Sequence, residues 1–275
     1  MPTTPPEPVR SGLSLSGRHL SYLDFGGPGP LLLALHGHFG EARTFAPLAR
    51  HLAPDWRVVA LDQRGHGYSD QPPDFSRDGY VEDAAAVLRH LGGGPAVVLG
   101  HSLGGVNAYQ LAFRHPRLVR ALIVEDIGAE VDGDLSFCLA WPHRAPTRAA
   151  LLEALGGSAS YLTDAVREYG DGWGLAFRPD GMAASQRALN GDHWPAWLGS
   201  SCPALLVRGS RSGVLHGDHA RAMAAGRPGT RLVELPTGHT VHETEPERFA
   251  AAVRTFLDGL PAAPDNRLPP TGPAG

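Results

Sequence analysis

The chain has 275 residues, of which 42% are hydrophobic and 19% are charged, and its formal net charge is −4. These values are typical of a soluble globular protein, and they give no electrostatic reason to expect nucleic acid or an anionic membrane as a partner. No apolar run approaches the roughly 20 residues that a membrane span requires, and the N-terminus lacks the basic and apolar regions of a secretory signal. We therefore expect a cytoplasmic protein without a membrane span.

The two cysteines, Cys138 and Cys202, form neither a disulfide framework nor a metal-binding spacing. Two unpaired structural thiols are expected. The sequence contains no visible ligand cluster for a metal or an organic cofactor, so none is expected. At this length the chain can bury one large core with an elaboration.

The elements of the predicted fold lie between two Pro-rich tails, residues 1–10 and 261–275, which are expected to be disordered. Short apolar runs between the tails are typical of strands that are buried on both faces of a parallel sheet. They lie at residues 31–35, 58–61, 96–99, 121–124, 204–207 and 232–235. Helical segments alternate with them, at residues 45–51, 81–91, 106–113, 219–225 and 247–257. This alternation predicts an α/β fold with a mostly parallel, doubly wound sheet.

Residues 131–197 break the alternation, because they contain no clear buried strand. The segment is too long for a plain loop, and helical patches are expected within it at residues 147–155 and 162–169. We interpret it as a helical cap over a core made of residues 11–130 and 198–260.

Aromatic side chains are frequent in this predicted cap, and most of them are expected to form its own core. Trp141 and Trp194 are nevertheless candidates for the wall of a substrate pocket, together with Phe39 from the loop after the first predicted strand.

Ser102 lies in the segment Gly-His-Ser-Leu-Gly-Gly, residues 100–105, between a predicted strand and a predicted helix. This is the G-x-S-x-G pattern in the strand–turn–helix context that presents a nucleophilic serine. Glycine at 100 and 104 avoids collisions in so tight a turn. The alternative is an ordinary glycine-rich turn with a serine that caps the helix.

A serine nucleophile that attacks an acyl group creates a negatively charged oxygen, which preorganised backbone amides stabilise. One amide is expected from the residue after the nucleophile, Leu103, and one from the first loop, residues 36–40, which reads His-Gly-His-Phe-Gly. We assign the second amide to His38, with Phe39 as the alternative.

The base that activates Ser102 must lie at the same edge of the sheet. His239 is the first histidine after the last predicted strand, and Gly238 permits a sharp exit from that strand. His242 lies three residues further and is the main rival.

An acid is needed to orient the base, but the loop after the penultimate predicted strand, residues 208–215, contains no carboxylate. The strand at 121–124 instead ends in Glu125 and Asp126. A carboxylate there could reach the histidine and hold its tautomer. Asp126 is the candidate, and Glu125 is the alternative.

Together these segments resemble the α/β-hydrolase superfamily over roughly residues 18–260, and a serine esterase or lactonase branch with a helical cap in particular. The matching segments are residues 36–40, 62–69 (Asp-Gln-Arg-Gly-His-Gly-Tyr-Ser), 100–105 and 236–239.

The resemblance implies that Ser102 is the nucleophile, that His239 is the base, and that the cap follows the sixth strand of the fold. A branch of the superfamily places its acid after that strand, which supports Asp126. The chain departs from relatives with a similar Arg-Gly-x-x-Ser loop at Gly213, where they often carry Asp.

The leading functional hypothesis is hydrolysis of a carboxylic ester or lactone of a small to medium apolar substrate through an acyl-enzyme. A carbon–carbon bond hydrolase, a thioesterase and a cofactor-free perhydrolase are alternatives on the same residues. A non-catalytic, receptor-like ligand-binding protein is the alternative from another class.

Overall fold

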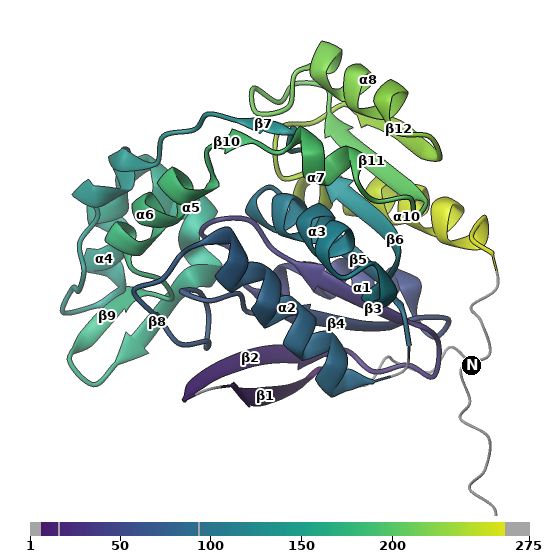
Figure 1. Ribbon diagram of the computed structural model, residues 1–275. Coiled ribbons are helices and arrows are strands. Elements are labelled where there is room, and N and C mark those ends of the chain that lie inside the picture. The colour runs from purple at the N-terminus through teal and green to yellow at the C-terminus, as the bar shows by residue number, and fades with distance from the viewer. Residues whose placement is uncertain (1–6, 16, 93, 262–275) are drawn as a thin grey trace, which may run out of the picture.

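An eight-stranded sheet runs through the computed structural model, which describes residues 7–15, 17–92 and 94–261 (Figure 1). The strand order is β1-β2-β4-β3-β5-β6-β11-β12. The strands are β1 (Val9–Leu15), β2 (Arg18–Asp24), β3 (Leu31–Leu35), β4 (Arg57–Leu61), β5 (Ala96–His101), β6 (Val119–Glu125), β11 (Ala204–Gly209) and β12 (Thr230–Leu235). All are parallel from β4 to β12, whereas β2 is antiparallel to both of its neighbours. The predicted fold class is confirmed.

The sequence analysis does not predict the hairpin that β1 and β2 form. Val9 pairs with Asp24 and Arg10 with Leu23, so the predicted N-terminal tail is wrong for these two residues. Side chains of β1 alternate between half-buried and exposed at the edge of the sheet, and such a strand leaves no continuous apolar run. Residues 1–6 and 262–275 of the two predicted tails lie outside the described residues.

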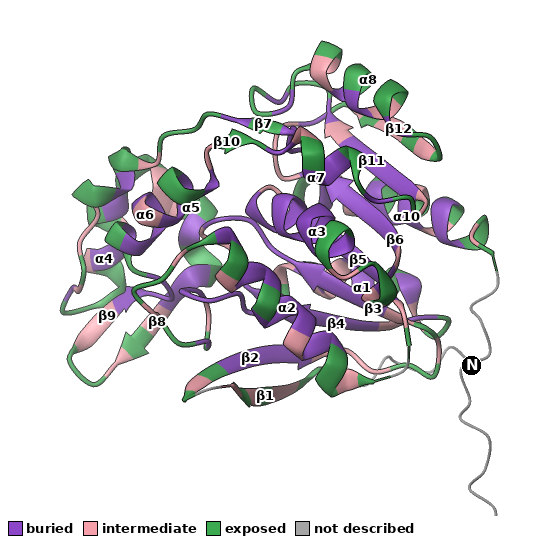
Figure 2. Cartoon of the chain, viewed as in Figure 1, coloured by how far each residue is buried: buried purple, intermediate pink, exposed green. Residues whose placement is uncertain are grey.

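Helices cover both faces of the sheet, whose inner parallel strands β3, β4, β5, β6 and β11 are almost wholly buried (Figure 2). Successive strand residues point to opposite faces: Leu33 belongs to the core on one face, and Leu32 to the core on the other. On the first face lie α2 (Arg77–Leu91), α3 (Leu103–Arg114) and α8 (Gly217–Gly226). On the second face lie α1 (Ala46–Leu52), α9 (Val241–Thr244) and α10 (Pro246–Asp258).

An insertion between β6 and β11 has a buried cluster of its own. It contains β7 (Glu130–Val131), α4 (Arg148–Leu155), α5 (Ala159–Leu162), β8 (Val166–Tyr169), β9 (Gly172–Leu175), α6 (Pro179–Leu189), β10 (Gly191–Asp192) and α7 (Trp194–Leu198). Short 3-10 turns complete the chain at Ala42–Phe45, Pro116–Leu118, Ser136–Ala140, Gly156–Ser158 and Thr163–Ala165. A cap-like insertion is therefore present after the sixth strand.

Two features of the insertion differ from expectation. The helical patch predicted at 162–169 is wrong over its second half, because Val166–Tyr169 is a strand that pairs with Gly172–Leu175. The Gly-Asp-Gly turn at residues 170–172 favours this hairpin over a helix. In addition, α7 packs on the main core: Trp197 is fully buried and meets the ring of Tyr109 in α3 edge-on.

Candidate active site

Ser102 occupies the turn between β5 and α3, in a left-handed backbone conformation with φ 51° and ψ −118°. A Cβ at position 100 would lie 2.0 Å from the carbonyl oxygen of Gly104, and a Cβ at position 104 would lie 2.1 Å from that of Leu35. Only glycine fits at either position. The Ser102 amide donates to the carbonyl of Glu125 on the neighbouring strand β6 (3.0 Å). The turn therefore holds a strained serine at the carboxyl edge of the sheet.

Asp126 follows β6 directly and also has a positive φ, 52°. Its carboxylate is fully buried and accepts three hydrogen bonds. Nδ1 of His239 donates to Oδ2 (2.8 Å), the Ser212 hydroxyl donates to the same oxygen (2.5 Å), and the Gly209 amide donates to Oδ1 (2.8 Å). The structure thus joins the candidate acid after β6 to the candidate base after β12, across the end of β11, which lies between these strands.

The loop that carries His239 is held by a second histidine. Nε2 of His101 donates to the main-chain carbonyl of His239 (3.1 Å), and the two rings are 4.6 Å apart. Burial, together with the neighbouring His239 and His242, holds the pKa of His101 well below its usual value. A neutral His101 with its proton on Nε2 therefore helps to place His239.

Glu125 and His242, the two alternatives, pair with each other instead. Glu125 accepts from the ring Nδ1 and the backbone amide of His242, at 2.9 Å each. Glu125 is 0% exposed and His242 is 3% exposed, and neither lines the cavity described below. Burial alone would lower the pKa of His242, but the carboxylates of Glu125 and Glu243 together outweigh it, and the pKa is raised.

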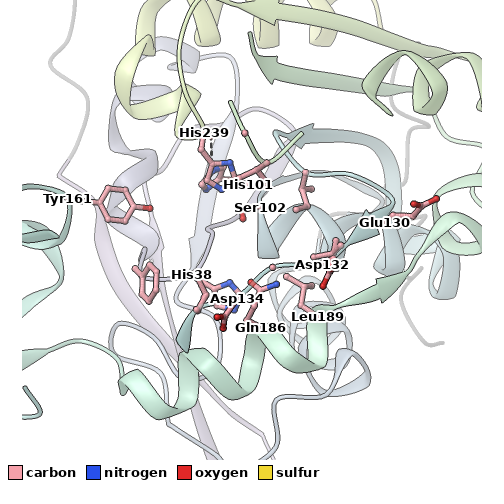
Figure 3. Close-up of a pocket in the computed structure, with 17 residues that line it drawn as sticks. His38, His101, Ser102, Glu130, Asp132, Asp134, Tyr161, Gln186, Leu189 and His239 are labelled. Atoms are coloured by element: carbon pink, nitrogen blue, oxygen red, sulfur yellow. Dashed lines mark hydrogen bonds between the residues drawn. The ribbon is translucent and has the colours of Figure 1, made fainter. Parts of the chain in front are cut away.

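Ser102 and His239 line one cavity of about 380 Å³, into which both side chains point (Figure 3). Within the described part of the chain, no hydrogen bond joins the Ser102 hydroxyl to the His239 ring. The cavity wall is mixed: acidic Glu130, Asp132 and Asp134 accompany apolar side chains, and no described residue that lines it is arginine or lysine. The apolar wall residues are Phe39, Ile127, Val131, Leu135, Tyr161, Leu189 and Val214.

The first loop lies against the turn of Ser102. A Cβ at position 37 would lie 2.7 Å from Nδ1 of His101 and 3.1 Å from Cβ of Ser102, so glycine at 37 permits this approach. His38 and Phe39 both line the cavity, and Phe39 has a positive φ of 68°. Leu103 is the first residue of α3, where the backbone amide has no acceptor within the helix. The two amides assigned to the oxyanion therefore lie on adjoining segments.

Of the three aromatic pocket candidates, Phe39 lines this cavity, and Trp141 and Trp194 are not among its lining residues. Trp141 packs edge-on against Phe39 (5.1 Å between centroids) within the cluster of the insertion. Trp194 stacks on His219 and donates from Nε1 to Glu130 (2.7 Å). These contacts, rather than the cavity, account for both side chains.

Several lining or supporting residues were not singled out from the sequence. They are Glu130, Asp132, Asp134, Tyr161, Ser185, Gln186 and Ser212. The acidic segment Glu-Val-Asp-Gly-Asp at 130–134, directly after the candidate acid's loop, is a signal that could have found three of them. Ser185 and Ser212 carry no comparable signal, because a serine on a helix or a loop is common.

The described residues offer no group of three or more histidine, cysteine, aspartate or glutamate side chains that could hold a metal ion. None of the helices in the described ranges is both long and apolar enough to span a bilayer. Cys138 and Cys202 are both free thiols.

Comparison with known proteins adds to this geometry. The model of the alpha/beta hydrolase family matches residues 31–252. A 2-(acetamidomethylene)succinate hydrolase of Mesorhizobium japonicum is 30% identical over 253 residues, which cover 84% of this chain and 89% of the relative. An sn-1-specific diacylglycerol lipase of Mus musculus is 29% identical over 251 residues, with 83% and 81% covered.

Solved structures agree at the level of the fold. The crystal structure of E-2-(acetamidomethylene)succinate hydrolase superposes with a TM-score of 0.82 at 27% identity and covers 92% of this chain and 100% of its own. An enol-lactonase from Burkholderia xenovorans superposes with a TM-score of 0.73 at 21% identity, with 90% and 100% covered.

Proposed function

The chain belongs to the alpha/beta hydrolase family, and we propose that it hydrolyses a carboxylic ester or a lactone through an acyl-enzyme on Ser102. One observation carries the proposal: Ser102 and the His239 ring that is hydrogen-bonded to Asp126 line the same cavity. A buried carboxylate on Nδ1 leaves Nε2 of the imidazole to act as the base.

In the proposed reaction, Nε2 of His239 takes the proton of the Ser102 hydroxyl as the oxygen attacks the substrate carbonyl. The resulting oxyanion accepts hydrogen bonds from the amides of His38 and Leu103. His239 then donates its proton to the leaving alkoxide, and the acyl group remains on Ser102. Water, activated by the same imidazole, attacks this ester, and the proton returns to Ser102 as the acid leaves.

The mechanism requires the Ser102 hydroxyl to reach Nε2 of His239 when a substrate occupies the cavity. Catalytic hydrogen bonds are often long before substrate binds and shorten in the complex. Asp126 supports this step by fixing the proton of His239 on Nδ1 and by stabilising the imidazolium that forms.

The cavity also limits the substrate. A volume of about 380 Å³ suits a small to medium molecule. A succinate, such as the one in the name of the Mesorhizobium relative, is a dicarboxylate, and carboxylates are usually held by arginine or lysine. Since the described lining contains acidic groups and no such cation, we propose a substrate without a free carboxylate.

Two assays test the proposal: hydrolysis of p-nitrophenyl butyrate, and labelling by a fluorophosphonate located by mass spectrometry. We expect label on Ser102, and we expect Ser102→Ala to abolish labelling and to lower turnover by about 10⁴-fold or more. Ser14→Ala, an exposed serine of β1, is the matched control and should leave both unchanged. Full activity in Ser102→Ala would contradict the mechanism, and a folded wild-type protein that neither hydrolyses nor labels would favour the ligand-binding alternative.

A further inference from the structure

The imidazole of His38 lies in the cavity wall and has a role that its backbone amide does not explain (Figure 3). Its Nε2 is 2.9 Å from the hydroxyl of Ser185 in α6, and this hydroxyl is 2.9 Å from the phenol oxygen of Tyr80 in α2. Ser185 and Tyr80 are 0% and 1% exposed. Three polar side chains from the first loop, the insertion and the core thus form one buried chain.

The protons of this chain can be placed by requiring that each hydroxyl proton has an acceptor. If Tyr80 donates to Ser185, and Ser185 donates to Nε2 of His38, both hydroxyl protons are used. If His38 instead carried its proton on Nε2, the proton of either Tyr80 or Ser185 would have no acceptor among the described residues. A buried donor without a partner costs about 1–3 kcal/mol. His38 therefore carries its proton on Nδ1.

Nδ1 of His38 has no hydrogen-bond partner in the described part of the protein, yet it is not among the fully buried atoms that lack one. Solvent therefore reaches it, and the face of His38 that is open to solvent is the cavity. We propose that His38 is a specificity-determining residue whose Nδ1–H binds a neutral acceptor oxygen of the substrate, such as an ether, hydroxyl or amide oxygen. This inference rests on the proposed ester hydrolysis at Ser102.

The surroundings keep this donor neutral. Burial, followed by the nearby His66 and Arg77, holds the pKa of the His38 imidazole well below its usual value. Burial likewise raises the pKa of Tyr80 to about 12, so its phenol keeps its proton. Around the cavity, Asp132 and Asp134 would repel a carboxylate, which favours an uncharged oxygen as the partner of Nδ1–H.

Matched esters that differ by one oxygen test the proposal. On the acyl side the pair is p-nitrophenyl butyrate and p-nitrophenyl methoxyacetate. On the alcohol side the pair is butyl butyrate and 2-methoxyethyl butyrate, assayed by acid release. In each pair an ether oxygen replaces a methylene. For each enzyme we take the ratio of kcat/KM for the ether ester to kcat/KM for the hydrocarbon ester. Comparing this ratio between variant and wild type cancels the intrinsic reactivity of the esters.

His38→Phe removes the ring nitrogens and keeps the backbone amide. We expect this variant to lower the ratio of kcat/KM for the ether ester to kcat/KM for the hydrocarbon ester by about threefold to tenfold in at least one pair. This is the effect of losing one hydrogen bond. His90→Phe, an exposed histidine of α2, is the matched control and should leave both ratios unchanged. Unchanged ratios in both pairs for His38→Phe would overturn the inference.

A spectroscopic measurement tests the donor without activity. In protein with ¹⁵N-labelled histidine, the signals that disappear in His38→Phe belong to His38, and their shifts tell a protonated from an unprotonated ring nitrogen. We expect the Nδ1–H form without titration between about pH 6 and pH 9, and we expect Ser185→Ala to disturb it. An Nε2–H form, or titration in this range, would overturn the inference.

The two proposals fail differently. If the wild-type protein hydrolyses none of the esters and Ser102 takes no label, the proposed function fails, and the ¹⁵N spectrum still decides the state of His38. If the esters are hydrolysed and His38→Phe changes both members of each pair equally, only the role of His38 fails.

Discussion

Two consecutive carboxylates at the end of β6, Glu125 and Asp126, each bind a histidine. The hydrogen bonds of the two pairs are alike, but their surroundings differ. Asp126 holds Nδ1 of His239 at 2.8 Å, and Glu125 holds Nδ1 of His242 at 2.9 Å. The side chain of His239 is 29% exposed and lines the cavity. Nε2 of His242 is buried and has no hydrogen-bond partner among the described residues; it lies 3.8 Å from Oε1 of Glu243, and the ring stacks on Phe45. A hydrogen-bonded pair is thus a candidate for catalysis only where its second nitrogen can reach a substrate.

The buried pair still bears on the open one. The backbone carbonyl of Glu125 accepts from the amide of Ser102, and its side chain anchors His242, three residues after His239. Glu125 therefore connects the turn of the nucleophile to the loop of the base. We predict that Asp126 and His239 take part in the reaction itself. We predict that Glu125 and His242 position the segments that carry Ser102 and His239.

The largest expected effect separates the pairs directly. Asp126→Asn should lower kcat by about 10³- to 10⁴-fold, because the amide cannot fix the tautomer or stabilise the imidazolium of His239. The melting temperature should change by only a few degrees. Steady-state kinetics with p-nitrophenyl butyrate and a thermal melt measure both effects. Asp218→Asn changes a side chain that is 98% exposed in the first turn of α8; it is the control and should remain fully active. A loss of activity in this variant would assign the role of the acid to Asp218.

The second prediction concerns Glu125→Gln, which should mainly lower stability. The raised pKa of His242 means that the pair contributes fully below pH 6.5, the usual value for histidine, and that its contribution is lost as the pH rises through the folded-state pKa. Breaking a buried ion pair costs about 3–5 kcal/mol, so we expect a deficit of this order at pH 6 and a smaller one at pH 9, measured by urea unfolding.

At temperatures where this variant is folded, kcat should fall by less than about fivefold. Glu82→Gln removes an exposed glutamate that also pairs with a histidine, His115, and should cost less than about 1 kcal/mol at either pH. A loss of kcat in Glu125→Gln as large as that in Asp126→Asn would erase the distinction between the two pairs.

The smallest expected effect concerns Ser212, which gives Asp126 a donor besides His239 and the Gly209 amide. Ser212→Ala should lower kcat by about tenfold and leave KM nearly unchanged, since one hydrogen bond to a charged group is lost while the other two remain. Ser210→Ala, an exposed serine of the same loop, provides the comparison. If both variants match the wild type, the Ser212 hydroxyl does not support the carboxylate.

The sequence predicts well what depends on continuous burial. The inner parallel strands have continuous apolar runs because both of their faces are covered, and the ends of β5, β6 and β12 bring residues 102, 126 and 239 to one edge. The roles assigned to these residues stay predictions. The sequence does not distinguish Glu125 from Asp126 as the partner of His239. Which of the two carboxylates faces this histidine depends on where β6 ends and on the positive φ of Asp126.

The pocket is harder to predict for a related reason. The sequence places Trp141 and Trp194 in the insertion, but it does not show that Trp141 packs edge-on against Phe39 or that Trp194 stacks on His219. The hairpin at β8 and β9 depends on a short glycine turn, which local helical periodicity does not report. The acidic wall at 130–134 depends on how the insertion leaves the sheet.

Three non-glycine residues within the described ranges have a positive φ: Phe39, Ser102 and Asp126. Each such conformation costs on the order of 1–3 kcal/mol, and all three lie around one site. A directed-evolution experiment that selects only for heat resistance should therefore favour substitutions that remove this backbone strain, for instance to glycine. Substitutions at these positions should then raise thermal stability at the expense of turnover. Stabilising substitutions in the edge strand β1 should raise thermal stability and leave turnover unchanged.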